Sequence, residues 1–225
     1  MVRLVSACVC NSDLPWLNCT LFAMAPIILG HGGAGVVEEI GEGVTSVEVG
    51  DHVVISWVPQ CGTCFFCLKD QGYLCENAGA ALAAGALLDG TTRSTSEGAP
   101  LPQMAGAGTF SEVSILPDIS VVKIPKDVDM RVAALIGCGV LTGTGAAMNT
   151  AHIKPGDTVA VIGCGGVGLN VIQGARIMGA TEIIAIDMNE TKLQMAKEFG
   201  ATASVNASQG DPVAQVMEMT GGRGA

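Results

Sequence analysis

The stretch TVAVIGCGGVG, Thr158–Gly168, decides the fold of the C-terminal part of this chain. Its first half, Thr158–Ile162, is a β-favouring run typical of a buried strand, and its second half is a Gly-x-Gly-x-x-Gly turn. A helix is predicted after the turn, at Leu169–Met178. The free N–H groups and the dipole at the start of such a helix favour an anion such as a pyrophosphate. The glycine pattern alone is weak evidence, and a structural turn without nucleotide is the alternative.

Strands and helices alternate after this turn. Two further strands are predicted at Glu182–Asp187 and Ala203–Asn206, and two further helices at Glu190–Phe199 and Asp211–Thr220. Alternation at this spacing is typical of a parallel sheet with crossover helices. The sequence therefore predicts an α/β fold, with the first three strands of a Rossmann dinucleotide-binding domain at residues 151–225.

Asp187, at the end of the second of these strands, indicates which cofactor the turn would take. It lies roughly 20 residues after the glycines, where an acid accepts hydrogen bonds from the adenosine ribose and repels a 2′-phosphate. Met188 and Asn189 supply no compensating cation, so NAD is favoured over NADP, with Lys192 near the ribose edge. The predicted cofactor-binding residues are Gly163, Gly165, Gly166, Gly168, Asp187 and Lys192.

Four cysteines lie close together in the run CGTCFFCLKDQGYLC: Cys61, Cys64, Cys67 and Cys75. Four thiolates at this spacing suit one tetrahedral zinc ion, with Zn–S bonds of about 2.3 Å. A pair of disulfides, as in a small secreted domain, is the alternative. We find no signal peptide, and a dinucleotide-binding segment follows, so a reducing, cytoplasmic location is expected.

Composition limits the class of protein. A chain of 225 residues can form one large domain or two small ones. We find no apolar run of the length that spans a bilayer, so no membrane partner is expected. We attribute the net charge of −10 to solvent-exposed acidic side chains. The negative charge and the low aromatic content of 4% both argue against a nucleic-acid partner.

The first 125 residues are predicted to be β-rich, because short β-favouring runs alternate with Gly, Pro and Asp turns. Asn77–Ala105 is predicted to be mostly loop, and Arg131–Thr150 to be helical. Glycines in the helical segment indicate close packing, a ligand near the backbone, or a loose helix–loop junction. The predicted strands are Gly35–Ile40, His52–Trp57, Phe110–Ile115 and Ser120–Ile124.

Cys10, His31 and Cys138 are candidates for a second metal site. A Cys2His set leaves one coordination position open, as a catalytic zinc requires. From the residues alone this site is unconvincing, since a histidine among glycines is more often structural. Buried cysteines also usually behave as small hydrophobic residues.

Several motifs together resemble the zinc-dependent alcohol dehydrogenases of the medium-chain dehydrogenase/reductase family. They are CNSD, ILGHGGAGVVEEIGEGVTSVEVGDHVV, PQCGTCFFC, GTFSE, IGCGVLTGTGA and VIGCGGVG, and they cover nearly the whole chain. LDGTTR and its long loop are similar to the class III-like and nitrosodimethylaniline-dependent enzymes. The resemblance implies an incomplete GroES-like, zinc-binding catalytic domain at residues 1–150.

The resemblance also implies residue roles. Cys10, His31 and Cys138 match the catalytic zinc ligands, and the four clustered cysteines match a structural zinc site, so two zinc ions per chain are expected. Asp13 matches an acid that orients the zinc-binding histidine, and Ser12 the hydroxyl that takes the substrate proton. Trp57 and Phe110 match residues that line the substrate pocket in the family, and ordinary core packing is an equal alternative for both. Thr142 and Val167 match residues beside the nicotinamide. Cys8, Cys19 and Cys164 match no ligand position.

The activity implied is hydride transfer between NAD and a primary or secondary alcohol, or a thiol–aldehyde adduct. A homo-oligomer is implied for the full-length form. The alternative is a catalytically inactive fragment or degenerate paralogue that keeps structural zinc and partial nucleotide binding.

The sequence also departs from the family pattern. Gly32 stands at the position where the family has a glutamate near the zinc. Pro15 stands where the family often has a histidine that relays the proton. Asn11 stands where the family usually has a cationic residue beside the cofactor phosphates. Val2–Ala7 resembles a strand that follows an N-terminal hairpin in the family. We therefore expect a chain truncated at both ends, and inactive or nearly so by itself.

Overall fold

The computed structural model describes residues 1–18, 20 and 25–225, so Cys19 lies outside the described residues. They form two compact units, Met1–Cys138 and Gly139–Ala225. The boundary predicted at 150/151 differs from this division, which falls inside a long helical segment rather than after it. The difference arises because the first turns of that segment contact the sheet of the first unit, whereas its last turns contact a helix of the second.

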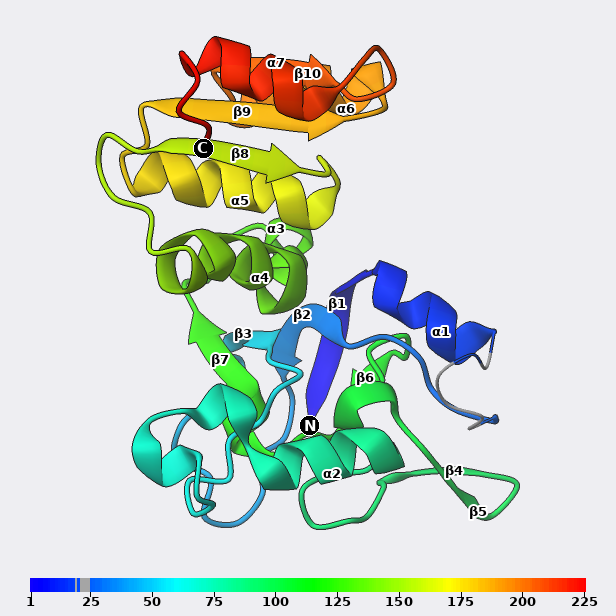
Figure 1. Cartoon of the computed structure of the whole chain (residues 1–225). Coiled ribbons are helices and arrows are strands. Elements are labelled where there is room, and N and C mark those ends of the chain that lie inside the picture. Colours follow the sequence, from blue (N-terminus) through cyan, green and yellow to red (C-terminus); the bar gives the residue numbers. More distant parts are fainter. Residues whose placement is uncertain (19, 21–24) are drawn as a thin grey trace. The chain divides into compact units, whose positions relative to one another are not determined.

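The first unit is built around a five-stranded antiparallel sheet in the order β6-β1-β2-β3-β7 (Figure 1). Fully buried Ala34 and Val53 lie in its central strands and anchor the core. The run predicted at Phe110–Ile115 is only partly a strand, because Ser111 donates a hydrogen bond to the Gly108 carbonyl and bends the chain there. The strands are β1 (Val2–Cys8), β2 (Gly32–Val37), β3 (His52–Ile55), β6 (Val113–Ser114) and β7 (Val121–Ile124).

The segment predicted to be mostly loop contains a helix, α2 (Glu76–Ala84), and a small hairpin of β4 (Ser94–Ser96) and β5 (Ala99–Leu101). Alanine has the highest helix propensity, and α2 is rich in it. The Cys75 sulfur caps its N-terminus by accepting from the Ala78 N–H, and Gly85 ends it with a φ of 61°. The loop prediction was therefore wrong for this stretch.

The helical segment Met130–Thr150 belongs to both units. It has 21 residues, and an 18-residue window within it has a mean hydropathy of 1.4, so the segment is long and apolar enough to cross a membrane by length and composition alone. This corrects the expectation that no apolar run reaches that length. Its buried residues pack within each unit, Ala133 and Ala134 in the first and Ala147 in the second. The segment comprises α3 (Met130–Leu135), a π-helical stretch (Ile136–Val140), α4 (Leu141–Gly145) and a second π-helical stretch (Ala146–Thr150).

Two glycines of this segment mark close backbone contacts. A Cβ at Gly137 would lie 2.2 Å from the Ile55 carbonyl oxygen of β3. A Cβ at Gly143 would lie 2.5 Å from the Val167 carbonyl oxygen. Close packing therefore explains these two glycines, whereas Gly139 faces open space.

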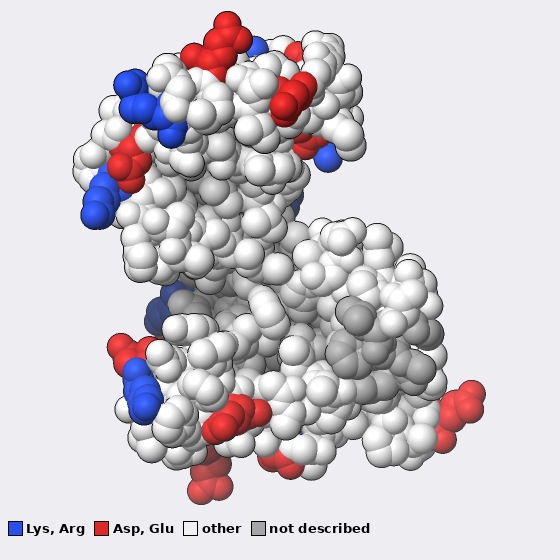
Figure 2. Space-filling view, in the orientation of Figure 1, with Lys and Arg blue, Asp and Glu red and all other residues white. Residues whose placement is uncertain are grey.

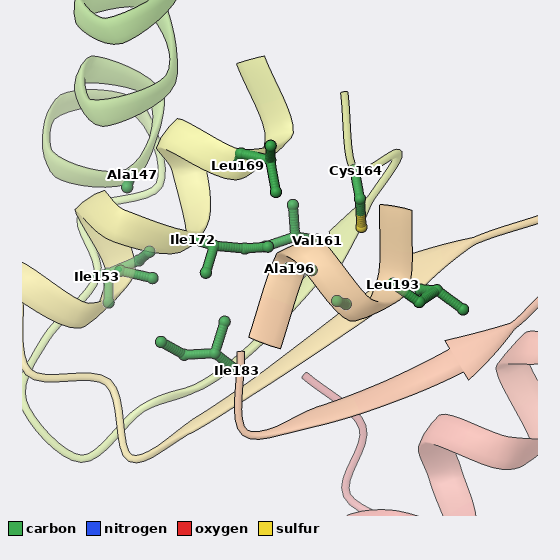
Figure 3. Packing of buried hydrophobic residues seen from close by; sticks show 11 residues of the cluster. Ala147, Ile153, Val161, Cys164, Leu169, Ile172, Ile183, Leu193 and Ala196 are labelled. Atoms are coloured by element: carbon green, nitrogen blue, oxygen red, sulfur yellow. The ribbon is translucent and has the colours of Figure 1, made fainter. Parts of the chain in front are cut away.

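The second unit contains a three-stranded parallel sheet in the order β10-β9-β8, as predicted (Figure 1). All three strands have the predicted bounds, while the first helix begins three residues earlier, inside the glycine turn, and ends one residue earlier than predicted. Figure 3 shows Ile172 of that helix beside Val161 in the main hydrophobic cluster. The elements are β8 (Thr158–Ile162), α5 (Gly166–Ile177), β9 (Glu182–Asp187), α6 (Glu190–Phe199), β10 (Ala203–Asn206) and α7 (Pro212–Met219).

Charged side chains on the face shown in Figure 2 are dispersed, with Lys and Arg interspersed among Asp and Glu. Because a phosphate backbone is held by a continuous basic surface, this face does not have the charge pattern of a nucleic-acid-binding site.

Candidate active site

The four clustered cysteines converge in the structure of the first unit. The sulfur atoms of Cys61, Cys64, Cys67 and Cys75 all lie within 4.8 Å of one another. Zn–S bonds of about 2.3 Å place sulfur atoms about 3.8 Å apart at the corners of a tetrahedron. The distance from Cys61 Sγ to Cys67 Sγ is 3.9 Å, close to that edge. The donor set therefore fits a structural zinc ion.

Hydrogen bonds prepare one of these sulfurs for a cation. The hydroxyl and N–H of Thr63 donate to Cys61 Sγ and lower the pKa of Cys61 to about 5. Burial instead raises the pKa of Cys67 to about 12. A metal must therefore displace protons from part of the set, so its binding releases protons.

The disulfide alternative is excluded for the described cysteines, because all of them are free thiols. A disulfide requires sulfur atoms about 2.05 Å apart, far shorter than the 3.9 Å between Cys61 and Cys67.

The second donor set, Cys10, His31 and Cys138, also converges, with ligand atoms within 4.8 Å of one another. Cys10 precedes a 3-10 turn (Asn11–Asp13), His31 precedes β2, and Cys138 lies in the first π-helical stretch. His31 Nε2 lies 3.4 Å from Cys138 Sγ, near the roughly 3.5 Å expected between N and S ligands of one tetrahedral zinc. Three ligands leave a fourth position open, so this set fits a catalytic zinc ion.

Asp13 orients this donor set through both of its carboxylate oxygens. Oδ1 lies 3.3 Å from His31 Nδ1, and Oδ2 accepts a hydrogen bond of 2.7 Å from the Cys10 N–H. Both the Asp13 and His31 side chains are less than a tenth exposed. With Nδ1 facing Asp13, the other ring nitrogen of His31, Nε2, faces Cys138 Sγ. Burial raises the pKa of Cys138 to about 12, and the nearby Cys10 adds to the rise.

A cavity of about 170 Å³ adjoins this donor set. Ser12 and Trp57 both line it, and the Trp57 ring meets the His31 ring edge-on at 6.0 Å. Phe110 does not line this cavity. Its ring lies beside Gly30, where an added Cβ would be 2.5 Å from Phe110 Cδ1. The complete lining is Ser12, Trp16, His31, Trp57, Leu82, Met104, Ala105 and Cys138.

Sequence reasoning missed four of these lining residues: Trp16, Leu82, Met104 and Ala105. Leu82 lies on α2, which was predicted to be loop, so no side of that segment was assigned to a site. The alanine-rich run between Cys75 and Gly85 was the signal that could have revealed the helix.

Gly32 leaves space beside the metal ligands. A Cβ there would lie 3.4 Å from Cys8 Cβ and 3.9 Å from Cys138 Cβ, which are ordinary contacts. The Gly32 carbonyl accepts a hydrogen bond from the Thr109 hydroxyl. A longer side chain at position 32 could therefore extend from a point close to the metal ligands. Glycine has no side chain and places no functional group there.

The glycine turn of the second unit brings Asp187 to the start of α5. Asp187 Oδ2 accepts a hydrogen bond of 2.8 Å from the Cys164 N–H, and Oδ1 accepts one of 2.9 Å from the Asn189 N–H. Both hydrogen bonds lower the pKa of Asp187, and the one from the Cys164 N–H has the larger effect. The sequence did not reveal that this carboxylate also holds the turn. Lys192, Thr142 and Val167 are exposed.

Comparison with known proteins identifies the family. Residues 1–126 match the alcohol dehydrogenase GroES-like domain, and residues 166–225 match the zinc-binding dehydrogenase family. The chain is 44% identical over 224 residues to an S-(hydroxymethyl)glutathione dehydrogenase of Synechocystis sp., covering 98% of this chain and 61% of that protein.

Solved structures agree. An alcohol dehydrogenase zinc-binding domain protein from Burkholderia ambifaria matches with a TM-score of 0.93 and 35% identity, over 98% of this chain and 60% of that one. Benzyl alcohol dehydrogenase from Acinetobacter calcoaceticus matches with a TM-score of 0.85 and 32% identity, over 98% and 59%. The chain thus spans about three fifths of the length of these relatives. It belongs to the zinc-dependent alcohol dehydrogenases of the medium-chain dehydrogenase/reductase family.

Proposed function

We propose that this chain carries the zinc centre and part of the nucleotide site of an NAD-linked alcohol dehydrogenase. The observation that supports this most is the Cys10–His31–Cys138 donor set, backed by Asp13 and bordering a cavity. A purely structural zinc site is normally closed by four protein ligands, whereas three protein ligands beside a cavity suit a reacting oxygen in the fourth position.

We assign each residue at the cavity a separate role in the reaction. When bound, a zinc ion would act as a Lewis acid that lowers the pKa of the alcohol hydroxyl. Ser12 lines the same cavity, and its hydroxyl is the group that we assign to accept the alcohol proton. Pro15 cannot continue a proton relay, so the proton passes from Ser12 to water. Asp13 holds His31 in the tautomer that leaves Nε2 free to bind the metal.

The reaction partners follow from the same residues and from the family. NAD is the proposed hydride acceptor, with pyrophosphate at the start of α5 and the adenosine ribose at Asp187. The relatives' names include an S-(hydroxymethyl)glutathione dehydrogenase and a benzyl alcohol dehydrogenase, so the proposed substrates are an alcohol or a thiol–aldehyde adduct. We further propose two zinc ions per chain, a cytoplasmic location and a homo-oligomeric whole protein.

The glycines of the turn allow nucleotide binding to be separated from folding. A Cβ at Gly168 would lie 1.8 Å from the Gly163 carbonyl oxygen, so Gly168→Ala should destabilise the second unit by about 1–3 kcal/mol or more. Gly165 has no atom within 4 Å of such a Cβ and a φ of −81°. Gly165→Ala should therefore melt like the unchanged protein but bind NAD more weakly, because the added methyl meets the pyrophosphate. Thermal unfolding and NAD titration measure the two effects, and equal NAD affinity in Gly165→Ala would contradict the assignment.

Hydride transfer itself is tested by following NADH or NADPH formation from an alcohol with the zinc-loaded whole protein. We expect NAD to be preferred by at least about tenfold, because Asp187 would repel a 2′-phosphate. Asp187→Asn should narrow that preference, and Asp187→Ala should narrow it further while loosening the turn held through the Cys164 N–H. Equal use of both cofactors by the unchanged protein would count against Asp187. No alcohol-dependent reduction of either cofactor by the zinc-loaded whole protein would count against the function.

A further inference from the structure

Cys8 lies on the same face of the chain as Cys10, one of the proposed metal ligands. Along β1 the side chains alternate between exposed and more buried positions, and Cys8 ends the strand on the more buried face. The alternation continues through Val9, which is 81% exposed, to the half-buried Cys10. Side chains two residues apart in an extended chain point to the same face. The Cys8 thiol therefore points to the side on which Cys10 lies.

Cys8 is also close to Cys138, a second ligand of the same set. β1 and β2 are antiparallel, and Cys8 lies directly opposite Gly32. A Cβ at Gly32 would lie 3.4 Å from Cys8 Cβ and 3.9 Å from Cys138 Cβ. The Cβ atoms of Cys8 and Cys138 are thus at most about 7.3 Å apart, the sum of these two distances. Because position 32 is glycine, no side chain from it occupies the space between them.

This spacing suits two cysteines that share one metal ion. With Zn–S bonds of about 2.3 Å, each cysteine Cβ lies roughly 3.3 Å from the metal, so two such Cβ atoms are up to about 6.6 Å apart. In the structure the Cys8 thiol donates a hydrogen bond of 3.6 Å to the Val9 carbonyl, and its sulfur is not among the ligand atoms within 4.8 Å of one another. A thiol is a weak donor, so rotation about the Cα–Cβ bond of Cys8 gives up little.

We propose that Cys8 is an exchangeable fourth ligand of the metal ion bound by the Cys10–His31–Cys138 set. Its thiol loses a proton to solvent when it binds the metal, and takes one up again when a substrate oxygen replaces it. Cys8 does not line the cavity, so it approaches the metal from another side and leaves the path of the substrate open. The proposal rests on the metal site of the proposed function, to which it adds a ligand that closes the site between substrates.

Cobalt reports the number of bound thiolates without cofactor or turnover. Co²⁺ substitutes for zinc in thiolate sites, and its near-ultraviolet charge-transfer absorption increases with the number of sulfur ligands. The whole protein loaded with two Co²⁺ ions should have seven thiolate ligands, four of them from the clustered cysteines. Cys8→Ser should still hold both ions, because three ligands remain at the second site, but its absorption should be lower by about one seventh.

Two further measurements test exchange and reach. Excess imidazole, a small ligand for open metal positions, should lower the absorption of the unchanged protein by the same seventh and should not lower that of Cys8→Ser. Gly32→Ala keeps the Cys8 thiol but places a methyl group against its Cβ, so this variant should also absorb less than the unchanged protein. Val9→Ala is the matched control, since Val9 is exposed on the opposite face, and it should leave the absorption unchanged.

Equal absorption of the unchanged protein and Cys8→Ser, each with two bound cobalt ions, would overturn the role of Cys8 and leave the proposed function intact. If Cys8→Ser fails to fold, an unchanged protein whose absorption does not respond to imidazole would overturn it in the same way. A single cobalt ion per chain in the unchanged protein, lost in Cys64→Ser, would remove both the inference and the metal site on which the proposed function depends.

Discussion

Cys64→Ser should remove one zinc ion per chain and leave the loop of the four clustered cysteines unfolded. This loop has almost no core of its own, since Phe65, Leu68 and Tyr73 are all more than half exposed. Structural zinc contributes about 10–16 kcal/mol of apparent binding free energy in small zinc-binding peptides. That exceeds what the few contacts within this loop can supply, so serine at one corner should abolish its order. Zinc analysis and limited proteolysis between residues 61 and 75 measure the result.

Cys8→Ser is the matched control for this change. Cys8 is a free thiol that belongs to neither donor set, so its replacement should retain both zinc ions. Thr63→Ala removes only the hydroxyl that lowers the pKa of Cys61, and it should weaken zinc binding at this loop without abolishing it. A soluble Cys64→Ser protein with unchanged zinc content and protease resistance would rule out a structural zinc site here.

The second unit could be predicted from the sequence almost completely, because each of its signals is local. Asp211 and Gly200 mark a helix start and a helix end by capping alone, and the strands alternate with helices at regular spacing. The donor residues could also be named, since the spacing of the clustered cysteines is itself a signal and the resemblance supplied Cys10, His31 and Cys138.

The rest depended on contacts between residues far apart in the chain. Leu82 and Met104 meet Trp16 and Trp57 only after folding, so no pattern in the sequence places them on one cavity. The second hydrogen bond of Asp187, to the Cys164 N–H, likewise joins a strand end to a turn. Phe110, which the resemblance assigned to a substrate pocket, does not line this cavity.

Cys138→Ser should remove the other zinc ion and abolish alcohol oxidation while leaving the fold intact. Lewis-acid stabilisation by such an ion is worth several kcal/mol, so activity of the zinc-loaded whole protein should fall by at least about a thousandfold. The fold should survive because the neighbouring helix is held by buried Ala133 and Ala134 and by the close contact of Gly137 with Ile55. Zinc analysis, thermal unfolding and NADH formation measure the three effects.

The variant Asp13→Asn distinguishes the role of the carboxylate that orients His31 from the role of the metal ligands themselves. An amide at this position can keep a hydrogen bond to His31 Nδ1 but loses the negative charge, so zinc affinity at this site should fall about 10- to 100-fold rather than vanish. Added zinc should therefore restore activity to Asp13→Asn and not to Cys138→Ser. Because Asp13 and Cys138 belong to the Cys10–His31–Cys138 site and the four clustered cysteines form a separate donor set, neither variant should change the zinc held by those four cysteines. Full activity in zinc-depleted Cys138→Ser would mean that the reaction does not pass through this donor set.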